Sequence, residues 1–234
     1  MSEQVGHIPA VDEGRSQVPG LATVGLVLAL AASLVLVAPA SPASAGTTVY
    51  RVEKKLHELR YPVGAVDGTQ DARTRLGLCA WRETHGMKIG RRAMTDQDVA
   101  SILSATRRPS TSRSKGIYVN ETCQMLYQVR DGKYRRIVRV STGRPGYGTP
   151  NGTGEVWRKW AGWHESSIYS GGWMLDSIYF RRDRPGIALH GSKSDSYVKP
   201  YPASHGCVRL RQWAIRKIFD ETPKGHKVRV YGAY

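Results

Sequence analysis

The stretch SHGCVR at residues 204–209 holds the most reactive combination of side chains in this chain. Cys207 is one of only three cysteines, so at least one thiol has no partner within the chain. We predict that Cys207 is reactive, because Arg209, a nearby imidazole and a helix expected to begin just after it would all favour a thiolate. Gly206 permits a sharp turn, so we expect the backbone N–H groups of Gly206 and Cys207 to hold an acyl oxyanion.

A nucleophilic thiol also needs a base, and His190 is the candidate. It ends the apolar run 187–189 and is followed by Gly191, which places its imidazole where a strand leaves the sheet. A lone histidine is more often a satisfied core residue. The 14 positions from His190 to Ser204 let a loop bring the second motif beside the first, so the two motifs together predict a cysteine and histidine pair.

The segments that must position this pair change character after residue 115, where the hydrophobic period becomes strand-like. Short β-rich runs are predicted at 116–120, 123–129, 134–140, 187–189 and 227–231, with Asp131-Gly132 as a hairpin turn. One helix is predicted over 210–221, stopped by Pro223 and Gly225. Many short strands with one helix favour a compact β domain over a parallel α/β sheet.

Five motifs in this region resemble the L,D-transpeptidases of the YkuD type, in the same order along the chain. They are GKYxxxxxVSTG at 132–143, TPNG at 149–152, YF at 179–180, HG at 190–191 and SHGCVR at 204–209. The resemblance spans about residues 116–232. It implies a mainly-β sandwich with the histidine and cysteine at one open end, and a cysteine acyltransferase that makes 3→3 peptidoglycan crosslinks through a thioester, with release of D-Ala.

The resemblance also implies a role for each site residue. Cys207 is the nucleophile, His190 is the general acid and base, and the backbone carbonyl of Gly191 orients the imidazole. The residues implied to shape the catalytic pocket beside the sulfur are Ser204, His205 and Gly206. The aromatic-rich segment 149–190 is implied to be a lid over the substrate cleft, with about half of its aromatic side chains packed in the core instead.

The side chains expected to bind the stem peptide are Met174, Tyr179, Phe180, Tyr201 and Arg209. Arg209 either stabilises the thiolate, binds a stem-peptide carboxylate, or forms a structural ion pair. No cofactor or metal is predicted, because ligand pairs at short fixed spacing are missing. Water as the acceptor would make the protein an L,D-carboxypeptidase, and a non-catalytic wall-binding protein is the other alternative. Papain-like and NlpC/P60-type hydrolases are disfavoured, because in them the cysteine precedes the histidine.

The beginning of the chain predicts export. Residues 21–38 carry no charge and are followed by the small residues Ala43 and Ala45, so we predict a signal peptide over residues 1–45, cleaved after Ala45. The preceding 20 residues contain one basic and three acidic side chains, unlike usual leaders. An uncleaved membrane anchor is the alternative, since 18 apolar residues just reach spanning length.

The charge balance points to a polyanionic partner. The chain has 35 Lys and Arg against 19 Asp and Glu, a formal net charge of +16. Such a surface attracts polyanions, or else its scattered arginines only keep an exported protein soluble. Because export is predicted, we expect the partners to be peptidoglycan and the anionic polymers of the cell wall, with no nucleic acid and no membrane contact beyond an uncleaved signal segment.

Residues 46–106 are predicted to form a small domain of three helices. The first apolar face is Val49, Val52, Leu56 and Leu59, and the second is Ala72, Leu76, Cys79 and Ala80. A capping box at Thr95 and Asp98 begins the third. The segment resembles a peptidoglycan-binding domain through Leu56, Leu59, Tyr61, Gly64, Asp67, Gly68, Thr74, Gly77, Leu78 and Trp81. It departs at residues 87–92, where the family repeats Asp-Gly; the alternative is a helical cap that only packs on the next domain.

Together these predictions describe an α+β protein with a linker at residues 107–115 and a catalytic domain at residues 116–234. Cys79 and Cys123 lie on predicted regular elements with apolar neighbours, so burial as free thiols is the default expectation. Outside the cell, a disulfide between them is the sharper alternative, and it would join the helical domain to the β domain.

Overall fold

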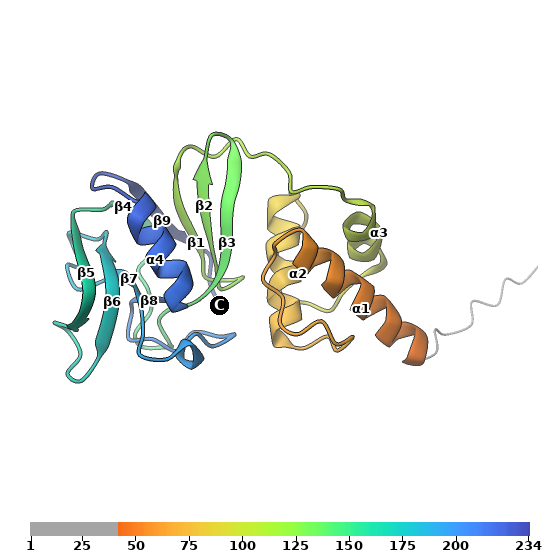
Figure 1. The fold of residues 1–234 in the computed structure, drawn as a ribbon, viewed down its shortest axis with the longest axis horizontal. Coiled ribbons are helices and arrows are strands. Elements are labelled where there is room, and N and C mark those ends of the chain that lie inside the picture. The colour runs from red at the N-terminus through yellow and green to blue at the C-terminus, as the bar shows by residue number, and fades with distance from the viewer. Residues whose placement is uncertain (1–41) are drawn as a thin grey trace, which may run out of the picture. The chain divides into compact units, whose positions relative to one another are not determined.

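Three helices open the part of the chain that the computed structural model describes, residues 42–234 (Figure 1). They are α1 (Pro42–Glu58), α2 (Ala72–Thr84) and α3 (Asp96–Ser104). The predicted apolar run 21–38 of the signal segment lies outside the described residues. Between residues 42 and 234, no helix is long and apolar enough to cross a membrane.

The ends of these helices follow from the local sequence. Asp71 caps α2 by accepting a hydrogen bond from the Thr74 backbone N–H. At α3, Thr95 accepts from the Asp98 N–H while the Asp98 carboxylate accepts from the Thr95 N–H, so the predicted capping box is confirmed. Tertiary packing supplies the rest, since α3 alone is too short to be stable in water.

After the helices, nine strands form one mixed sheet in the order β4-β9-β1-β2-β3-β8-β7-β6-β5. Their bounds are β1 Gly116–Asn120, β2 Met125–Arg130, β3 Lys133–Ser141, β4 Gly152–Glu155, β5 Arg158–Glu165, β6 Trp173–Tyr179, β7 Ala188–Gly191, β8 Val208–Leu210 and β9 Lys227–Tyr231. Only β1 with β9 and β7 with β8 pair in parallel. The predicted α+β class is confirmed, and the predicted sandwich is a single sheet that curls on itself (Figure 1).

Because the sheet curls, side chains from its two halves meet in the main hydrophobic core. Ile117 and Leu126 come from one part, and Ile178 and Leu189 come from the other. Helix α4 (Gln212–Glu221) buries Ile215 in the same core and packs against β6 and β7. The predicted helix therefore exists, beginning two residues later than residue 210.

A second core lies between the sheet and the three helices. Side chains alternate along β2, so Leu126 enters the first core while Met125, Tyr127 and Val129 enter the second. There they meet residues of α1, α2 and α3, including the fully buried Trp81. Both faces of β2 are therefore buried.

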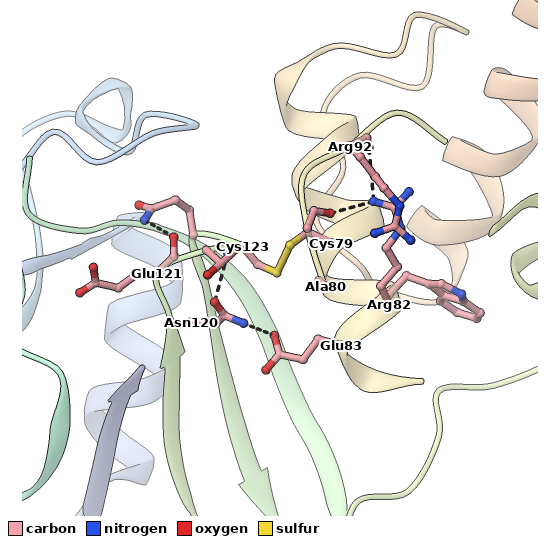
Figure 2. Close-up of a disulfide and its surroundings, with 12 residues drawn as sticks. Cys79, Ala80, Arg82, Glu83, Arg92, Asn120, Glu121 and Cys123 are labelled. Atoms are coloured by element: carbon pink, nitrogen blue, oxygen red, sulfur yellow. Dashed lines mark hydrogen bonds between the residues drawn. A yellow bond between two sulfur atoms is a disulfide. The ribbon is translucent and has the colours of Figure 1, made fainter. Parts of the chain in front are cut away.

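Cys79 of α2 and Cys123, just before β2, form a disulfide within this second core (Figure 2). The disulfide that was the alternative prediction is therefore confirmed, and the default expectation of two free thiols is wrong. Beside it, Asn120 donates to the Glu83 carboxylate at 2.7 Å and accepts from the Cys123 N–H at 3.2 Å. Covalent and polar contacts therefore join α2 to the sheet at the same place.

Candidate active site

Cys207 lies immediately before strand β8, and helix α4 begins only at Gln212. The expectation that a helix begins directly after Cys207 is therefore wrong. Residues 208–210 are taken into the sheet because they pair with β7 on one side and with β3 on the other. The helix amino terminus is displaced from the sulfur, and its partial charge acts within about one turn only.

His190 lies on β7, the parallel neighbour of β8, with His190 opposite Arg209 and Leu189 opposite Val208. Continuing this register by one position places Cys207 beside Ala188. Because side chains two residues apart share a face, His190 and Cys207 project from the same face as diagonal neighbours. Both line one cavity of about 470 Å³, as do Ser204, His205 and Arg209.

The imidazole of His190 is held in a defined tautomer. Its Nδ1 lies 2.7 Å from the carbonyl oxygen of Gly191, so Nδ1 carries the proton and donates it. The remaining nitrogen, Nε2, is left with a lone pair. Burial lowers the pKa of His190 to about 4, partly offset by the hydrogen bond to Gly191, so the ring is neutral at neutral pH.

The thiol of Cys207 is also neutral in this resting arrangement. It is 7% exposed, and its Sγ donates to the Gly186 carbonyl oxygen at 3.4 Å. Burial raises the pKa of Cys207 to about 11, although a backbone hydrogen bond from Ala188 and the charge of Arg209 act in the opposite direction. Cys207 and His190, the pair that the sequence predicts to react, are therefore both neutral in this arrangement.

The turn that precedes Cys207 is built by Ser204 and Gly206. The Ser204 hydroxyl donates to the Cys207 carbonyl oxygen at 2.5 Å and accepts from the Gly206 N–H at 3.1 Å. Gly206 has φ +111°, and a Cβ there would lie 2.9 Å from Cδ1 of Ile187, so glycine is required. The Gly206 N–H, which the sequence assigned to an oxyanion, is thus directed to Ser204, which leaves the Cys207 N–H as the candidate donor.

One side of the cavity is cationic. Arg209, Lys193 and Lys199 line it, and no acidic residue of the described chain does. Nη1 of Arg209 donates to the Ala203 carbonyl at 3.0 Å, and its guanidinium lies over the Tyr197 ring. Within residues 42–234, Arg209 forms no ion pair, so it is available for an anionic group.

The loop at residues 166–172, between β5 and β6, covers another side of the cavity. Tyr169 in this loop stacks on the ring of His205, with centroids 4.1 Å apart. Tyr147 meets the same imidazole edge-on at 5.0 Å. His205 is therefore held between two aromatic rings beside the sulfur.

The residues predicted to bind substrate separate into three groups. Met174 and Arg209 line the cavity, and Tyr179 packs with Met174 and Cys207 in a small buried cluster. Phe180 is fully buried in the main core and does not reach the cavity. Tyr201 is 47% exposed and lies outside the cavity lining. Phe180 directly follows Tyr179, the last residue of β6, and the two side chains lie in different clusters on opposite faces of the sheet.

The sequence predictions missed several residues in and near the cavity. Lys193, Tyr197 and Lys199 belong to the polar loop after β7, where no hydrophobic period marks a position. His164 lies on β5 outside the cavity lining, with its Nε2 2.8 Å from the Ser177 hydroxyl, and its charge contributes to the lowered pKa of His190. A histidine in the aromatic-rich segment was the only signal that pointed to it. In the part of the chain that the structure describes, no cluster of side chains has the composition of a metal site.

Comparison with known proteins agrees with this geometry. The family model of the YkuD L,D-transpeptidase catalytic domain matches residues 114–230. A crystal structure of an L,D-transpeptidase from Xylanimonas cellulosilytica is similar at 29% identity and a TM-score of 0.55, covering 78% of this chain and 92% of that one. An L,D-transpeptidase (Yku) from Stackebrandtia nassauensis is similar at 25% identity and a TM-score of 0.50, covering 81% and 93%. The search of curated proteins found no match.

Proposed function

Because this chain belongs to the YkuD family of L,D-transpeptidase catalytic domains, we propose that it forms 3→3 crosslinks between peptidoglycan stem peptides. The observation that carries the proposal is the placement of Cys207 and His190 on one face of adjacent strands, lining one cavity. The cationic lining suits a substrate with free carboxylates, as stem peptides have.

The first half-reaction transfers an acyl group to sulfur. Nε2 of His190 accepts the thiol proton as Sγ of Cys207 attacks the carbonyl carbon of the third stem residue. A carbon–sulfur bond forms, and the bond to the terminal D-Ala nitrogen breaks. The proton passes from Nε2 to that nitrogen, so D-Ala leaves as a neutral amine and the enzyme holds a thioester. The Cys207 N–H is the proposed donor to the oxyanion.

The second half-reaction releases the thioester. The amine of a second stem attacks the thioester carbon while His190 accepts a proton from it, and the carbon–sulfur bond then breaks. The proton returns to the Cys207 sulfur, which restores the neutral pair. Residues of the loop 166–172 line one side of the cavity. In this proposal, closure of that loop over the bound stems would limit the access of water and favour an amine acceptor over hydrolysis.

Acylation by a carbapenem tests the nucleophile directly. The thiolate attacks the β-lactam carbonyl and opens the ring, so the protein gains the whole mass of the drug. We expect one adduct by intact mass spectrometry, no adduct with Cys207→Ala, and at least a hundredfold slower acylation with His190→Gln. The matched control is Cys79→Ala/Cys123→Ala, which removes the other two cysteines and keeps the adduct. Folded protein that forms no adduct would identify a non-catalytic wall-binding protein.

Incubation with purified tetrapeptide stems tests the acceptor. We expect a crosslinked dimer together with one released D-Ala per crosslink. A tripeptide as the only product would instead identify an L,D-carboxypeptidase.

A further inference from the structure

A second cationic site lies away from the active-site cavity and shares no lining residue with it. It consists of two neighbouring cavities of about 1070 and 470 Å³, both lined by Ile137, Val138 and Trp213. They lie between the helical segment and strand β3. We name them the large and the small basic cavity.

The small basic cavity contains a buried and unsatisfied cation. Arg139 is 8% exposed, and its Nε is buried with no hydrogen-bond partner. Arg73 and Arg211 line the same cavity from different segments of the chain. Burial lowers the pKa of Arg139 to about 10, and the charges of Arg211 and Arg73 act in the same direction. A buried charge without a partner is costly, so this site is arranged for an anion.

Acidic side chains do not neutralise this cluster. The charge of Asp71 partly offsets the repulsion at Arg139, but its carboxylate accepts hydrogen bonds from the backbone and the hydroxyl of Thr74 at the start of α2 and forms no ion pair with the arginine. No carboxylate of the described residues lines either basic cavity or forms an ion pair with Arg139. Three guanidinium groups therefore surround one small space.

The large basic cavity extends the positive charge along β3. The cationic residues that line it are Arg60, Arg107, Arg108, Lys133, Arg135 and Arg136. Of these, Arg136 is paired with Glu221. These cations come from separate segments of the chain, at residue 60, residues 107–108 and residues 133–136, and they line a space of about 1070 Å³. Charges spread over a cavity of this size match a chain with repeated charges better than a single small anion.

We propose that the two basic cavities bind a linear polyol-phosphate polymer, with Arg139 holding one phosphodiester group and the large cavity holding the neighbouring groups. A tetrahedral phosphate accepts hydrogen bonds from several directions, as three guanidinium groups require, whereas one planar fork satisfies a carboxylate. Trp213 is the one strongly exposed aromatic residue of the lining, whereas single-stranded nucleic acid is usually held by a series of stacking rings. The site would tether the protein to an anionic polymer independently of Cys207.

Titration of the protein with a defined glycerol-phosphate oligomer tests this proposal. The variant is Arg73→Gln/Arg211→Gln, in which both changed side chains are exposed and no core contact is lost. We expect Kd to rise at least tenfold, and the slope of log K against log salt to become shallower by about 1.4 for two lost phosphate contacts. The matched control is Arg216→Gln/Lys217→Gln, which removes the same charge from exposed positions of α4 outside both cavities, and we expect at most a twofold change.

Three results would overturn the proposal. They are an equal loss of affinity in the variant and the control, tighter binding of an oligonucleotide of equal charge, and equal binding of an oligouronate, whose anions are carboxylates. Arg139→Lys, checked for folding by its thermal transition, should also lose at least fivefold in affinity. Carbapenem acylation should be unchanged in every variant, which separates this proposal from the activity proposed for Cys207.

Discussion

At the scale of single residues, the unusual feature of the site is that both members of the reactive pair are uncharged at rest. Burial disfavours the thiolate of Cys207 and the imidazolium of His190 together, since each charged form would lose hydration. A preformed ion pair is therefore not the resting state. In the mechanism that we propose, the base is the lone pair of Nε2, which the Gly191 hydrogen bond leaves available.

The neutral pair predicts a characteristic pH dependence. The folded-state pKa of His190 is about 4, below its ordinary value, so the ring stays a competent base as the pH falls through 6.5 and becomes protonated only near 4. We expect the rate of carbapenem acylation to be nearly constant from about pH 5.5 to 9 and to fall by half near pH 4. Stopped-flow acylation across this range measures it. An acid limb centred near pH 6.5 would contradict the neutral pair, as would thiolate ultraviolet absorbance at pH 7 that Cys207→Ala abolishes.

The sequence was sufficient to predict that Cys207 and His190 lie together at one cavity, because the chemistry that marks them is local. A glycine beside each of Cys207 and His190, and the spacing of the two motifs, sufficed to select this pair. The surroundings were less predictable. The Gly206 N–H donates to Ser204 instead of facing the cavity. The helix expected at Cys207 begins only at Gln212, because residues 208–210 pair with β3 and β7, which are distant in the sequence.

At the scale of elements, the hairpin of β5 and β6 and its loop line one side of the active-site cavity. Its strands were not predicted, because their pattern is interrupted. The pairing shifts register between Trp160 and Trp163, where Asp176 adopts a positive φ of 51° and accepts a hydrogen bond from the Gly162 N–H. By contrast, β1, β2, β3 and β9 were predicted within two residues of their ends.

The loop at the end of this hairpin predicts a specific effect on substrate binding. Tyr169→Ala removes the ring that stacks on His205, a contact worth about 0.5–1.5 kcal/mol. We expect KM for a tetrapeptide stem to rise about twofold to tenfold, with faster proteolysis of residues 166–172. Tyr169→Phe keeps the ring and should behave as the unmodified protein. Trp163→Ala, also an exposed aromatic residue of the hairpin but outside the cavity, is the matched control, and an equal effect there would contradict a role for stacking.

At the scale of the whole molecule, contacts between α2 and the sheet join the helical segment to the β domain. Glu83 of α2 accepts hydrogen bonds from Asn120 and from the Tyr231 hydroxyl, and it pairs with Arg113 at 2.9 Å. The apolar faces of the helices were predictable from their period. Their burial against Met125 and Tyr127 was not, because a strand with both faces buried does not reveal which core each side chain enters. Peptidoglycan binding by the helical segment stays a prediction.

The disulfide is the covalent part of this connection and gives a prediction for stability. It links residues 44 positions apart, and a closed loop of that size restricts the unfolded chain by about 4 kcal/mol in the loop-entropy account. We expect Cys79→Ala/Cys123→Ala to lower the free energy of unfolding by about 3–4 kcal/mol in urea titrations. Cys207→Ala, which removes a cysteine and keeps the disulfide, is the control and should lose much less. Because the active-site cavity shares no residue with this disulfide, the double variant should still be acylated at low denaturant. An unchanged urea midpoint in the double variant would contradict this prediction and show that the disulfide does not stabilise the folded protein.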